Sequence, residues 1–506
     1  MTQASTPAVA AAERAPFEQA APGQASFEHD QLVELVSASG RCVVTSAVPQ
    51  AASAGLWAFA RGGNAFDAAL AACMVETVAL PMKCGLAGDV VALFSQAGGP
   101  LQALVSVGPG AQALAQGARL ERVGPCSVGV PGAPDGYAAL HARASLPLAS
   151  LVEPAVAAAR DGVAWSRAGL AYLREARALL QRWSPDCIYL SQLGAGIGDR
   201  LKLPGLAQLL TEFADAGPAL FEGRAGHELV THLSALGGFV GRDDLRTRPA
   251  QLSVPLRLSD GQGRSFYATP APTDGAVLIE ALEHRAVRHA GAVASGAEGS
   301  ASDDASALAD LVAQLRARAR AAGATARDGG TSVVAAGDEH GNLVVVVHSN
   351  SYPRFGSGVV LPSGLVLNNR PGRGFDPQAS EGPRAAAAGR TPPTTLHAWG
   401  LEDAQGLRLG ATPGGVNQLP WNLQMLDALW GGASLAAAVT APHWAIDEEG
   451  QYSVEAGIDL DGERFAPRRL ARFGLKSAQQ IVHRRPDGSL VGVADPRVGA
   501  RAAALY

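Results

Sequence analysis

Short apolar runs separated by helical segments recur along the whole chain. Apolar runs predict strands at residues 42–47, 90–94, 101–107, 252–258, 265–268 and 407–409. Apolar residues recurring at intervals of three and four, with glycine or proline stops, predict helices at residues 49–61, 65–80, 137–144, 146–161, 167–183, 207–215 and 417–429. Because strands and helices are interspersed throughout, the pattern favours a layered α/β protein.

Two further apolar runs flank a polar, glycine-containing turn. The first run starts at Thr331, the turn covers residues 337–342, and the second run covers residues 343–348. This arrangement predicts a β-hairpin, so at least part of a sheet is antiparallel. Before Thr331 the chain is rich in Gly, Ala and Ser, with a low-complexity stretch at residues 289–302. We expect this region to be flexible, apart from a helix that Asp303 or Asp304 caps and that runs to Ala321.

Thr331 stands where the flexible segment meets a core strand, and two interpretations are open. The threonine can simply initiate the strand, which is the interpretation that this pattern favours by itself. It can also be a nucleophile that becomes an N-terminus when the chain is cut before it. In that case the freed α-amine serves as the base for the adjacent hydroxyl.

Composition narrows the class of protein. The chain has 506 residues, 47% hydrophobic and 17% charged, with a net charge of −5, which is typical of a globular protein. No basic face is indicated, so nucleic acid is not an expected partner. No apolar run is long enough to span a membrane and no signal peptide is visible. We therefore expect a cytoplasmic protein with a disordered tail at residues 1–38.

Familiar catalytic motifs are missing from the sequence. There is no H-E-x-x-H, no G-x-S-x-G and no G-x-G-x-x-G after a strand, so zinc proteases, α/β-hydrolases and dinucleotide enzymes lose support. Five cysteines without C-x-x-C spacing predict buried free thiols, and neither a metal nor a cofactor is implied. The turn at residues 85–89 is expected to line a cleft rather than to bind phosphate. His348 and His397 are expected to be structural.

Taken in order, several landmarks resemble the γ-glutamyltransferase (γ-glutamyltranspeptidase) family of N-terminal-nucleophile hydrolases. Each landmark is weak alone, but their order is specific, and together they span nearly all of residues 40–500. They are Gly62–Ala69, Cys84–Asp89, Val128–Gly132, Glu153–Ala155, Thr331, Gly341–Asn342, Phe355–Val359, Leu367–Asn369, Pro413–Gly415, Ala441–Trp444 and Ala494–Arg497.

The resemblance implies a four-layer αββα sandwich that is made as a precursor. Thr331 would attack the carbonyl of Gly330 and divide the chain into a large subunit, residues 39–330 after the tail, and a small subunit, residues 331–506. The same hydroxyl would then attack a substrate amide.

The resemblance also assigns roles around the nucleophile. Ser349 matches a second threonine that hydrogen-bonds the nucleophile. The N–H groups of Gly414 and Gly415 match an oxyanion hole, a role that suits glycine because no Cβ obstructs the approach. Thr394 and Thr395 occupy the place of a serine pair that contacts substrate.

Two departures concern the substrate. γ-Glutamyl enzymes carry an arginine after the strand that here ends at Val107, and this chain has Gly108-Pro109-Gly110-Ala111 there. Their aspartate in an N-N-x-x-D-D-F segment is also missing, since the chain continues from Asn369 as Arg370-Pro371-Gly372. A zwitterionic glutamyl group needs both charges. This segment looks more like the oxamate amidohydrolase and acylase branch, in which Arg370, with Asn369 beside it, would read a carboxylate or carbonyl of the substrate. A purely structural arginine is the alternative.

The sequence therefore predicts a self-processing amidohydrolase or acyltransferase acting on a small-molecule amide. One alternative is a true γ-glutamyltransferase or glutathione hydrolase. Another is an unprocessed, catalytically silent member that serves as a binding or scaffold protein. The sequence does not show whether water or an amine accepts the acyl group, or whether the chain forms a homo-oligomer. It also leaves open the roles of His348, Asn350 and Asp89.

Overall fold

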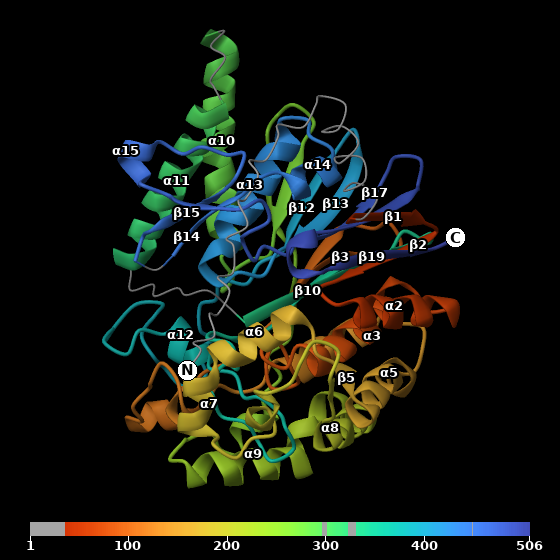
Figure 1. Ribbon diagram of the computed structural model, residues 1–506, viewed down its shortest axis with the longest axis vertical. Coiled ribbons are helices and arrows are strands. Elements are labelled where there is room, and N and C mark those ends of the chain that lie inside the picture. Colours follow the sequence, from red (N-terminus) through yellow and green to blue (C-terminus); the bar gives the residue numbers. More distant parts are fainter. Residues whose placement is uncertain (1–35, 296–300, 322–329, 448) are drawn as a thin grey trace, which may run out of the picture.

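Two seven-stranded antiparallel sheets lie face to face at the centre of the molecule (Figure 1). The computed structural model describes residues 36–295, 301–321, 330–447 and 449–506. In spatial order, the first sheet consists of β19 (Arg501–Leu505), β2 (Cys42–Ser46), β10 (Gly330–Asp338), β11 (Leu343–Ser351), β3 (Asp89–Ser95), β4 (Leu101–Ser106) and β7 (Gln251–Ser253). The second consists of β1 (Ser37–Gly40), β18 (Leu490–Ala494), β17 (Gln480–Arg484), β13 (Gly406–Ala411), β12 (Trp399–Asp403), β9 (Ser265–Ala268) and β8 (Leu256–Ser259).

Helices cover the outer face of each sheet. The first sheet packs against α2 (Pro49–Ala60), α3 (Ala65–Ala79) and α4 (Ala133–His141), and beyond them α5 (Leu148–Asp161) packs on α3 and on α8 (Pro204–Ala216). The second packs against α10 (Gly275–Ser295), α11 (Ala301–Ala321), α13 (Gln418–Trp430) and α14 (Leu435–Thr440). A third apolar cluster, which includes Val91, Val333, Val345, Leu409 and Val482, fills the space between the sheets. These layers confirm the predicted αββα sandwich.

Shorter elements complete the molecule. The remaining helices are α6 (Arg167–Glu175), α7 (Arg177–Trp183), α9 (Arg224–Ala235), α12 (Arg370–Gly374) and α15 (Gly462–Phe465). Two small sheets pair β5 (Val163–Ala164) with β6 (Arg200–Leu201), and β14 (Trp444–Ile446) with β15 (Tyr452–Glu455) and β16 (Arg468–Leu470). The 3-10 turns are η1 (Gln112–Gln116), η2 (Pro125–Ser127), η3 (Leu190–Gln192), η4 (Gly217–Glu222), η5 (Asp244–Arg246), η6 (Gly415–Asn417) and η7 (Pro496–Val498).

Helix α3 shows how local sequence fixes the layer beneath the hairpin. Asn64 accepts hydrogen bonds from the N–H groups of Phe66 and Asp67, and Asp67 accepts one from the N–H of Asn64, which completes a capping box. Asp67 also accepts the N–H groups of Ser145 and Leu146, which join α3 to the connection before α5. The many alanines of α3 let it approach the sheet closely, so almost the whole helix is buried.

The predicted strand at residues 252–258 is wrong in one respect, because the structure divides it. β7 ends at Ser253 and joins the first sheet, whereas β8 begins at Leu256 and joins the second. Pro255 lies between them, and it lacks the N–H that a continuous strand would donate. The segment therefore crosses from one sheet to the other at this proline.

The expected flexible region is also partly wrong. Helix α10 continues to Ser295 and α11 begins at Ala301, so much of the low-complexity stretch is helical. Alanine is the strongest helix former, and this outweighs the intervening glycines. Residues 1–35 of the predicted tail lie outside the described residues. Its last residues differ from the prediction, because Ser37 and Ala38 pair with β18.

Arg497 connects landmark segments that are far apart in the sequence. Its guanidinium donates to both carboxylate oxygens of Glu455, to Asp495 and to the carbonyl oxygens of Val439 and Ala441. The side chains of Arg497, Glu455 and Asp495 are fully buried. Since a buried charge must be paired, this arginine explains why the 441–444 and 494–497 landmarks occur together.

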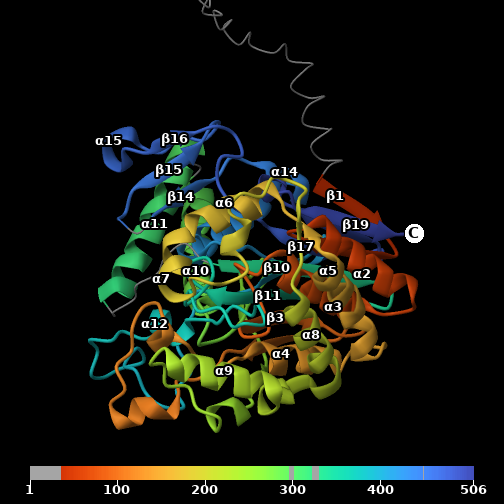
Figure 2. The ribbon, with the colours of Figure 1, turned by 60° about the horizontal axis from the view of Figure 1, so that its bottom comes forward.

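The predicted subunit boundary divides the chain but not the fold. Strand β10 contains both Gly330 and Thr331 and lies in the middle of its sheet, between β2 and β11 (Figure 2). The second sheet likewise mixes strands from before and after position 331. Fragments cut at this point would stay interleaved through backbone hydrogen bonds on both sides of β10.

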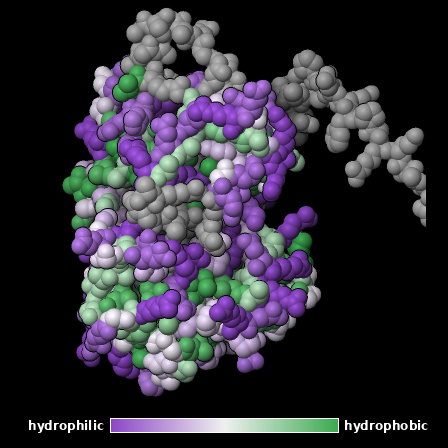
Figure 3. Space-filling model, turned by 90° about the vertical axis from the view of Figure 1, so that its left-hand side faces the viewer, coloured by the Kyte–Doolittle hydropathy of each residue, from purple (hydrophilic) through white to green (hydrophobic). Residues whose placement is uncertain are grey.

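The surface and the thiols add little to the functional picture. Hydrophilic and hydrophobic side chains are interspersed among the coloured residues of the face in Figure 3. No helix in the described residues is long and apolar enough to cross a membrane. All five cysteines are free thiols, and the expected burial holds for Cys73 and Cys84, whereas Cys42, Cys126 and Cys187 are only half-buried.

Candidate active site

Three polar residues stand in one row across adjacent strands of the first sheet. Thr331 of β10 pairs with Ser349 of β11, and Ser349 pairs with Asp89 of β3. Side chains alternate along strands, and Val333, Val347 and Val91 on the same faces belong to the cluster between the sheets. Thr331, Ser349 and Asp89 therefore all point into the space between the two sheets, at one end of the sandwich.

A chain of hydrogen bonds joins this row to the peptide bond before Thr331. The hydroxyl of Thr331 donates to Ser349 Oγ over 3.1 Å, and Ser349 donates to the carbonyl oxygen of Gly330 over 2.6 Å. The N–H of Ser351 donates to Ser349 Oγ over 2.9 Å. Thr331 and Ser349 are 2% and 1% exposed. The structure thus brings the predicted nucleophile, its predicted partner and the predicted cleavage point together.

The backbone around this row is tightly constrained. Ser351 adopts φ 73°, a left-handed conformation that non-glycine residues rarely adopt. Asn350 donates its N–H to the carbonyl oxygen of Lys83 over 2.7 Å. A Cβ on Gly330 would lie 2.8 Å from the carbonyl oxygen of Ser351 and 3.0 Å from that of Met82. The backbones of residues 82–83 and 351 therefore pack closely around Gly330, and Asn350 joins these segments through its N–H and through its Nδ2, which donates to the carbonyl oxygen of Pro81 over 3.2 Å.

Gly414 and Gly415 lie at the start of the helical segment that leads into α13. Their φ angles are 139° and 55°, so both positions favour glycine. A Cβ on Gly414 would lie 2.4 Å from the ring of Trp421. Among the described residues, neither glycine N–H has a hydrogen-bond acceptor. Unpaired N–H groups at a helix N-terminus can stabilise a negative oxygen, as the sequence predicts for this pair.

Arg370 is bound to Asp89, at the end of the polar row. Its Nε donates to Asp89 Oδ2 over 2.7 Å, and the N–H of Gly108 donates to Asp89 Oδ1 over 3.1 Å. Burial raises the pKa of Asp89, and the charge of Arg370 opposes that shift. Arg370 is thus joined through Asp89 to Gly108, the start of the segment in which the expected arginine is missing. Arg370 is therefore not a surface residue. Its Nε is already bonded to Asp89 and cannot contact a substrate.

The other predicted substrate residues are held by local contacts. The Nδ2 of Asn369 donates to the carbonyl oxygens of Arg122 and Tyr352, while its Oδ1 is buried without a partner in the described residues. Thr394 Oγ1 accepts the N–H of Leu396. Thr395 is half-buried, and its carbonyl oxygen is bonded to His397. None of these hydrogen bonds reaches Thr331, so the substrate roles of Thr394 and Thr395 stay predictions.

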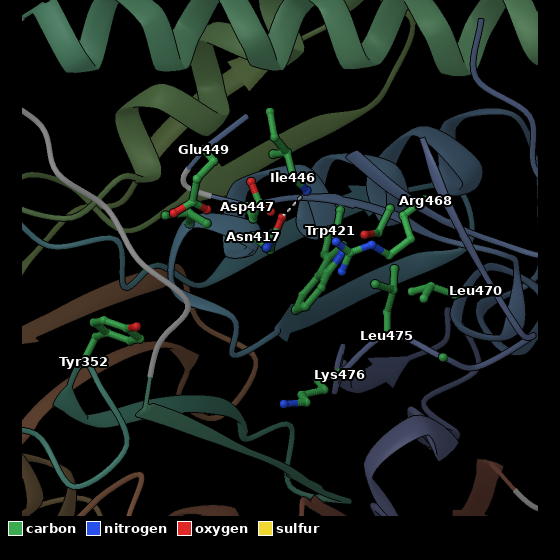
Figure 4. A pocket seen from close by; sticks show the side chains of 14 residues that line it. Tyr352, Asn417, Trp421, Ile446, Asp447, Glu449, Arg468, Leu470, Leu475 and Lys476 are labelled. Atoms are coloured by element: carbon green, nitrogen blue, oxygen red, sulfur yellow. Dashed lines mark hydrogen bonds between the residues drawn. The ribbon is translucent and has the colours of Figure 1, made fainter. Parts of the chain in front are cut away.

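A cavity of about 550 Å³ is lined by Trp421, the residue whose ring packs against Gly414 (Figure 4). Tyr352, which directly follows Ser351, lines one side, and Val416 and Asn417, which directly follow Gly415, line another. Trp421 lies beside Arg468, Asp447 lies beside Asn417, and Glu449 and Lys476 also line the cavity. The cavity is thus lined by residues next in the chain to the predicted catalytic segments, but not by Thr331, Ser349, Gly414 or Gly415 themselves.

His348 lies on the opposite face of β11 from Ser349. Its Nε2 is 2.7 Å from Glu76 Oε2, and its Nδ1 is 2.8 Å from the hydroxyl of Tyr137. Glu76 also accepts the hydroxyl of Ser46, and all these groups are buried. Cys84 lies close enough to complete a possible metal-ligand group with Glu76 and His348, but hydrogen bonds already use their ligand atoms. These hydrogen bonds join β11 to α3 and α4 on the face of the strand opposite Ser349, as expected for a structural histidine.

His397 is buried beside Thr395 and is held as the neutral imidazole. One ring nitrogen bonds the carbonyl oxygen of Thr395 over 2.9 Å, and the other accepts from Asn422 Nδ2 over 2.8 Å. Asn422 Oδ1 is itself bonded by Gln479, which fixes the orientation of the amide. Burial lowers the pKa of His397 to about 4. A second ring proton would face a donor, so the imidazolium is excluded from this site.

We expect His397 to make the protein less stable in acid. Its folded-state pKa lies below the unfolded value near 6.5, so its contribution is complete above pH 6.5 and is lost as the pH falls toward 4. The loss between pH 7 and pH 5 should be about 2 kcal/mol. Urea unfolding at both pH values measures it. His397→Gln should show a flatter pH dependence, His340→Gln in the exposed hairpin turn controls for the substitution, and equal slopes would contradict the assignment.

Comparison with known proteins places the fold and the site in context. The family model described as gamma-glutamyltranspeptidase matches residues 51–290 and 300–505. The chain is 30% identical over 271 residues to the acylase ACY 1 proenzyme of Pseudomonas sp. (strain SE83), covering 49% of this chain and 48% of that one. It is 27% identical over 509 residues to the oxamate amidohydrolase proenzyme of Klebsiella pneumoniae, covering 87% and 94%. The first curated relatives, glutathione hydrolases among them, are matched over only 35% to 48% of their length.

A solved structure agrees with the sandwich architecture. The crystal structure of cephalosporin acylase from Bacillus halodurans superimposes with a TM-score of 0.79 at 24% identity, covering 93% of this chain and 97% of that one. At this identity the likeness concerns the fold.

Proposed function

Because the chain belongs to the gamma-glutamyltranspeptidase family, we propose that it is a self-processing amidohydrolase or acyltransferase with Thr331 as its nucleophile. The substrate is a small-molecule amide, and the acyl group passes through an ester with Thr331. Relatives named acylase and oxamate amidohydrolase support an amide substrate, and the word proenzyme in their names supports processing of a precursor.

One observation carries the proposal: the hydrogen-bond chain from Thr331 through Ser349 to the carbonyl oxygen of Gly330. In this geometry Thr331 Oγ1 attacks the Gly330 carbonyl carbon while its proton passes to Ser349, whose own proton moves to the carbonyl oxygen. Collapse of the tetrahedral intermediate breaks the bond between Gly330 C and Thr331 N, and the nitrogen takes up the proton. Water then hydrolyses the ester, which releases the Gly330 carboxylate.

Processing creates the group that turnover needs. The freed α-amine of Thr331 has an ordinary pKa near 8 and can accept the proton of the adjacent hydroxyl. Thr331 Oγ1 then attacks the substrate carbonyl, the leaving amine takes the proton, and water or an amine releases the acyl group. In this proposal the N–H groups of Gly414 and Gly415, which have no acceptor in the described residues, stabilise the oxyanion of this second reaction.

Both alternative functions make different demands on the site. A true γ-glutamyltransferase needs separate positive and negative groups for the glutamyl head, whereas here Asp89 and Arg370 neutralise each other. A silent scaffold has no need of a hydroxyl chain buried against one peptide bond. A panel containing γ-glutamyl-p-nitroanilide, oxamate and acyl-amino acids compares these functions. Turnover of the γ-glutamyl compound alone would favour the glutathione hydrolase.

Ser349→Ala is expected to slow self-cleavage by about 100-fold or more, because it removes the proton relay and the donor to the Gly330 carbonyl oxygen. The measurement is the conversion of full-length chain into fragments 1–330 and 331–506, followed on denaturing gels after synthesis. Ser349→Thr keeps the hydroxyl and should retain cleavage.

Ser332→Ala is the matched control for this variant. Ser332 is a buried serine next to Thr331 on β10, its side chain faces the helical layer, and its hydroxyl has no partner in the described residues. It should cleave at the wild-type rate. Equal slowing of Ser332→Ala and Ser349→Ala would show a general loss of stability, and wild-type cleavage of Ser349→Ala would rule out the relay.

A further inference from the structure

The ion pair between Asp89 and Arg370 is buried and leaves a donor atom of Arg370 without an acceptor in the described residues. The side chain of Asp89 is fully buried and that of Arg370 is 6% exposed. Both carboxylate oxygens of Asp89 are used, one by Arg370 Nε and one by the N–H of Gly108. Arg370 Nη2, however, is buried and has no acceptor in the described residues. A buried cationic donor without an acceptor is costly, and such a group in a native protein requires an explanation.

The position of the pair provides that explanation. Asp89 is the direct cross-strand neighbour of Ser349, which is the neighbour of Thr331, so the pair ends the polar row of the candidate nucleophile. The N–H of Arg370 donates to Asn368 Oδ1 over 2.8 Å. Asn369, which lies between these two residues in the chain, donates its Nδ2 to the carbonyl oxygen of Tyr352, a residue of the cavity wall. The unpaired Nη2 is therefore part of an ion pair that stands in the same cross-strand row as the candidate nucleophile.

The charge of the pair limits what can bind there. Asp89 and Arg370 together are neutral, so a carboxylate brought to Nη2 would leave a net negative charge in a buried site, with Asp89 close by. A zwitterionic head is disfavoured as well, because its ammonium would find both oxygens of Asp89 already used. A neutral oxygen acceptor, by contrast, satisfies Nη2 without adding charge.

We propose that Asp89 and Arg370 form the acyl-specificity site, which selects amides whose acyl part carries a neutral oxygen acceptor such as a second amide carbonyl. Asp89 is the positioning and charge-setting residue, and Arg370 contacts the acyl group through Nη2. This inference rests on the proposed function, since it names the substrate class of the same site.

Matched substrate pairs that differ only in charge test the inference. Oxamide and oxamate, succinamide and succinamate, and glutaramide and glutaramate are offered to the processed enzyme, and ammonia release gives kcat/KM for each. The neutral member of a pair should be preferred by at least about tenfold. Asp89→Asn keeps the shape and the acceptor for Gly108 but exposes the charge of Arg370. It should move the preference toward the anionic member by at least about tenfold.

Two further variants complete the design. Arg370→Gln alone would leave Asp89 buried without its counter-charge, so the double variant Asp89→Asn with Arg370→Gln is used, and it should lose turnover of both members of a pair. Asp403→Asn is the matched control, because Asp403 forms a comparable ion pair with Arg408 at the far end of β12. It should keep the wild-type preference.

The outcomes separate this inference from the proposed function. A wild-type preference for the anionic members, an unchanged ratio in Asp89→Asn, or a processed enzyme that turns over no pair would each overturn the specificity site while leaving self-processing intact. A chain that never cleaves at Gly330 and hydrolyses no amide would overturn the proposed function itself.

Discussion

The Thr331→Ala variant is expected to remain a single chain of 51.6 kDa and to show no amide turnover. The substitution removes the oxygen that attacks Gly330 and, later, the substrate, and it leaves Ser349 without its donor. Loss of a nucleophile removes the covalent route altogether, so both processing and kcat should fall below detection. Intact mass and N-terminal sequencing measure the cleavage, and the amide panel measures turnover.

Two further variants serve as controls for this result. Thr331→Ser keeps an attacking hydroxyl and should still cleave. Thr45→Ala removes another buried threonine of the same sheet, whose hydroxyl has no partner in the described residues, and should process normally. Fragments that begin at residue 331 in Thr331→Ala would show that another group cuts the chain. Fragments that begin elsewhere in the wild type would place the nucleophile at a different residue.

The hairpin around Thr331 could be predicted because its signals are local. Two apolar runs and a polar turn define β10 and β11, and their register then places Thr331 opposite Ser349. The neighbour on the other side of Ser349 could not be predicted in this way. Asp89 reaches the row because β3 lies beside β11, and strand order is a property of the whole sheet. The sequence alone therefore leaves the role of Asp89 open.

Arg370 shows a second limit. Its residue type and its place after Asn369 suggested a substrate contact or a structural arginine, and the structure contains elements of both. Nε is committed to Asp89, while Nη2 is left without an acceptor in the described residues. This division depends on a partner 281 residues away in the chain, which no local pattern reveals. The mis-assigned region before Thr331 has a different cause, because glycine-rich composition hid the end of helix α10, whereas the helix predicted up to Ala321 is present as α11.

The positions of Asp89 and Arg370 also explain why membership of the family does not by itself determine the substrate. The resemblance places an arginine after β4 and an acidic pair after the two asparagines, each available to the substrate. In this chain the acidic residue is the first residue of β3 and the arginine follows the asparagines. They are bonded to each other. The catalytic row is therefore compatible with the family chemistry, while the adjoining recognition site has become neutral.

Gly414→Ala is expected to separate the two reactions of Thr331. A Cβ at this position meets the Trp421 ring at 2.4 Å, and φ 139° is strained for alanine, so the Gly414 and Gly415 N–H groups should be displaced. Loss of an oxyanion donor lowers kcat by about 100- to 1,000-fold. Self-cleavage should persist, because the Gly330 carbonyl oxygen receives its hydrogen bond from Ser349 instead.

Gly432→Ala provides the matched control at the other end of α13. Gly432 also has a positive φ, 87°, but an added Cβ would meet nothing within 4 Å, so strain is introduced far from the glycine pair. This variant should retain both cleavage and kcat. If Gly414→Ala loses cleavage together with turnover, one oxyanion site serves both reactions, and the separate role of Ser349 is wrong. If its kcat is unchanged, the glycine pair does not stabilise the transition state, and another donor must do so.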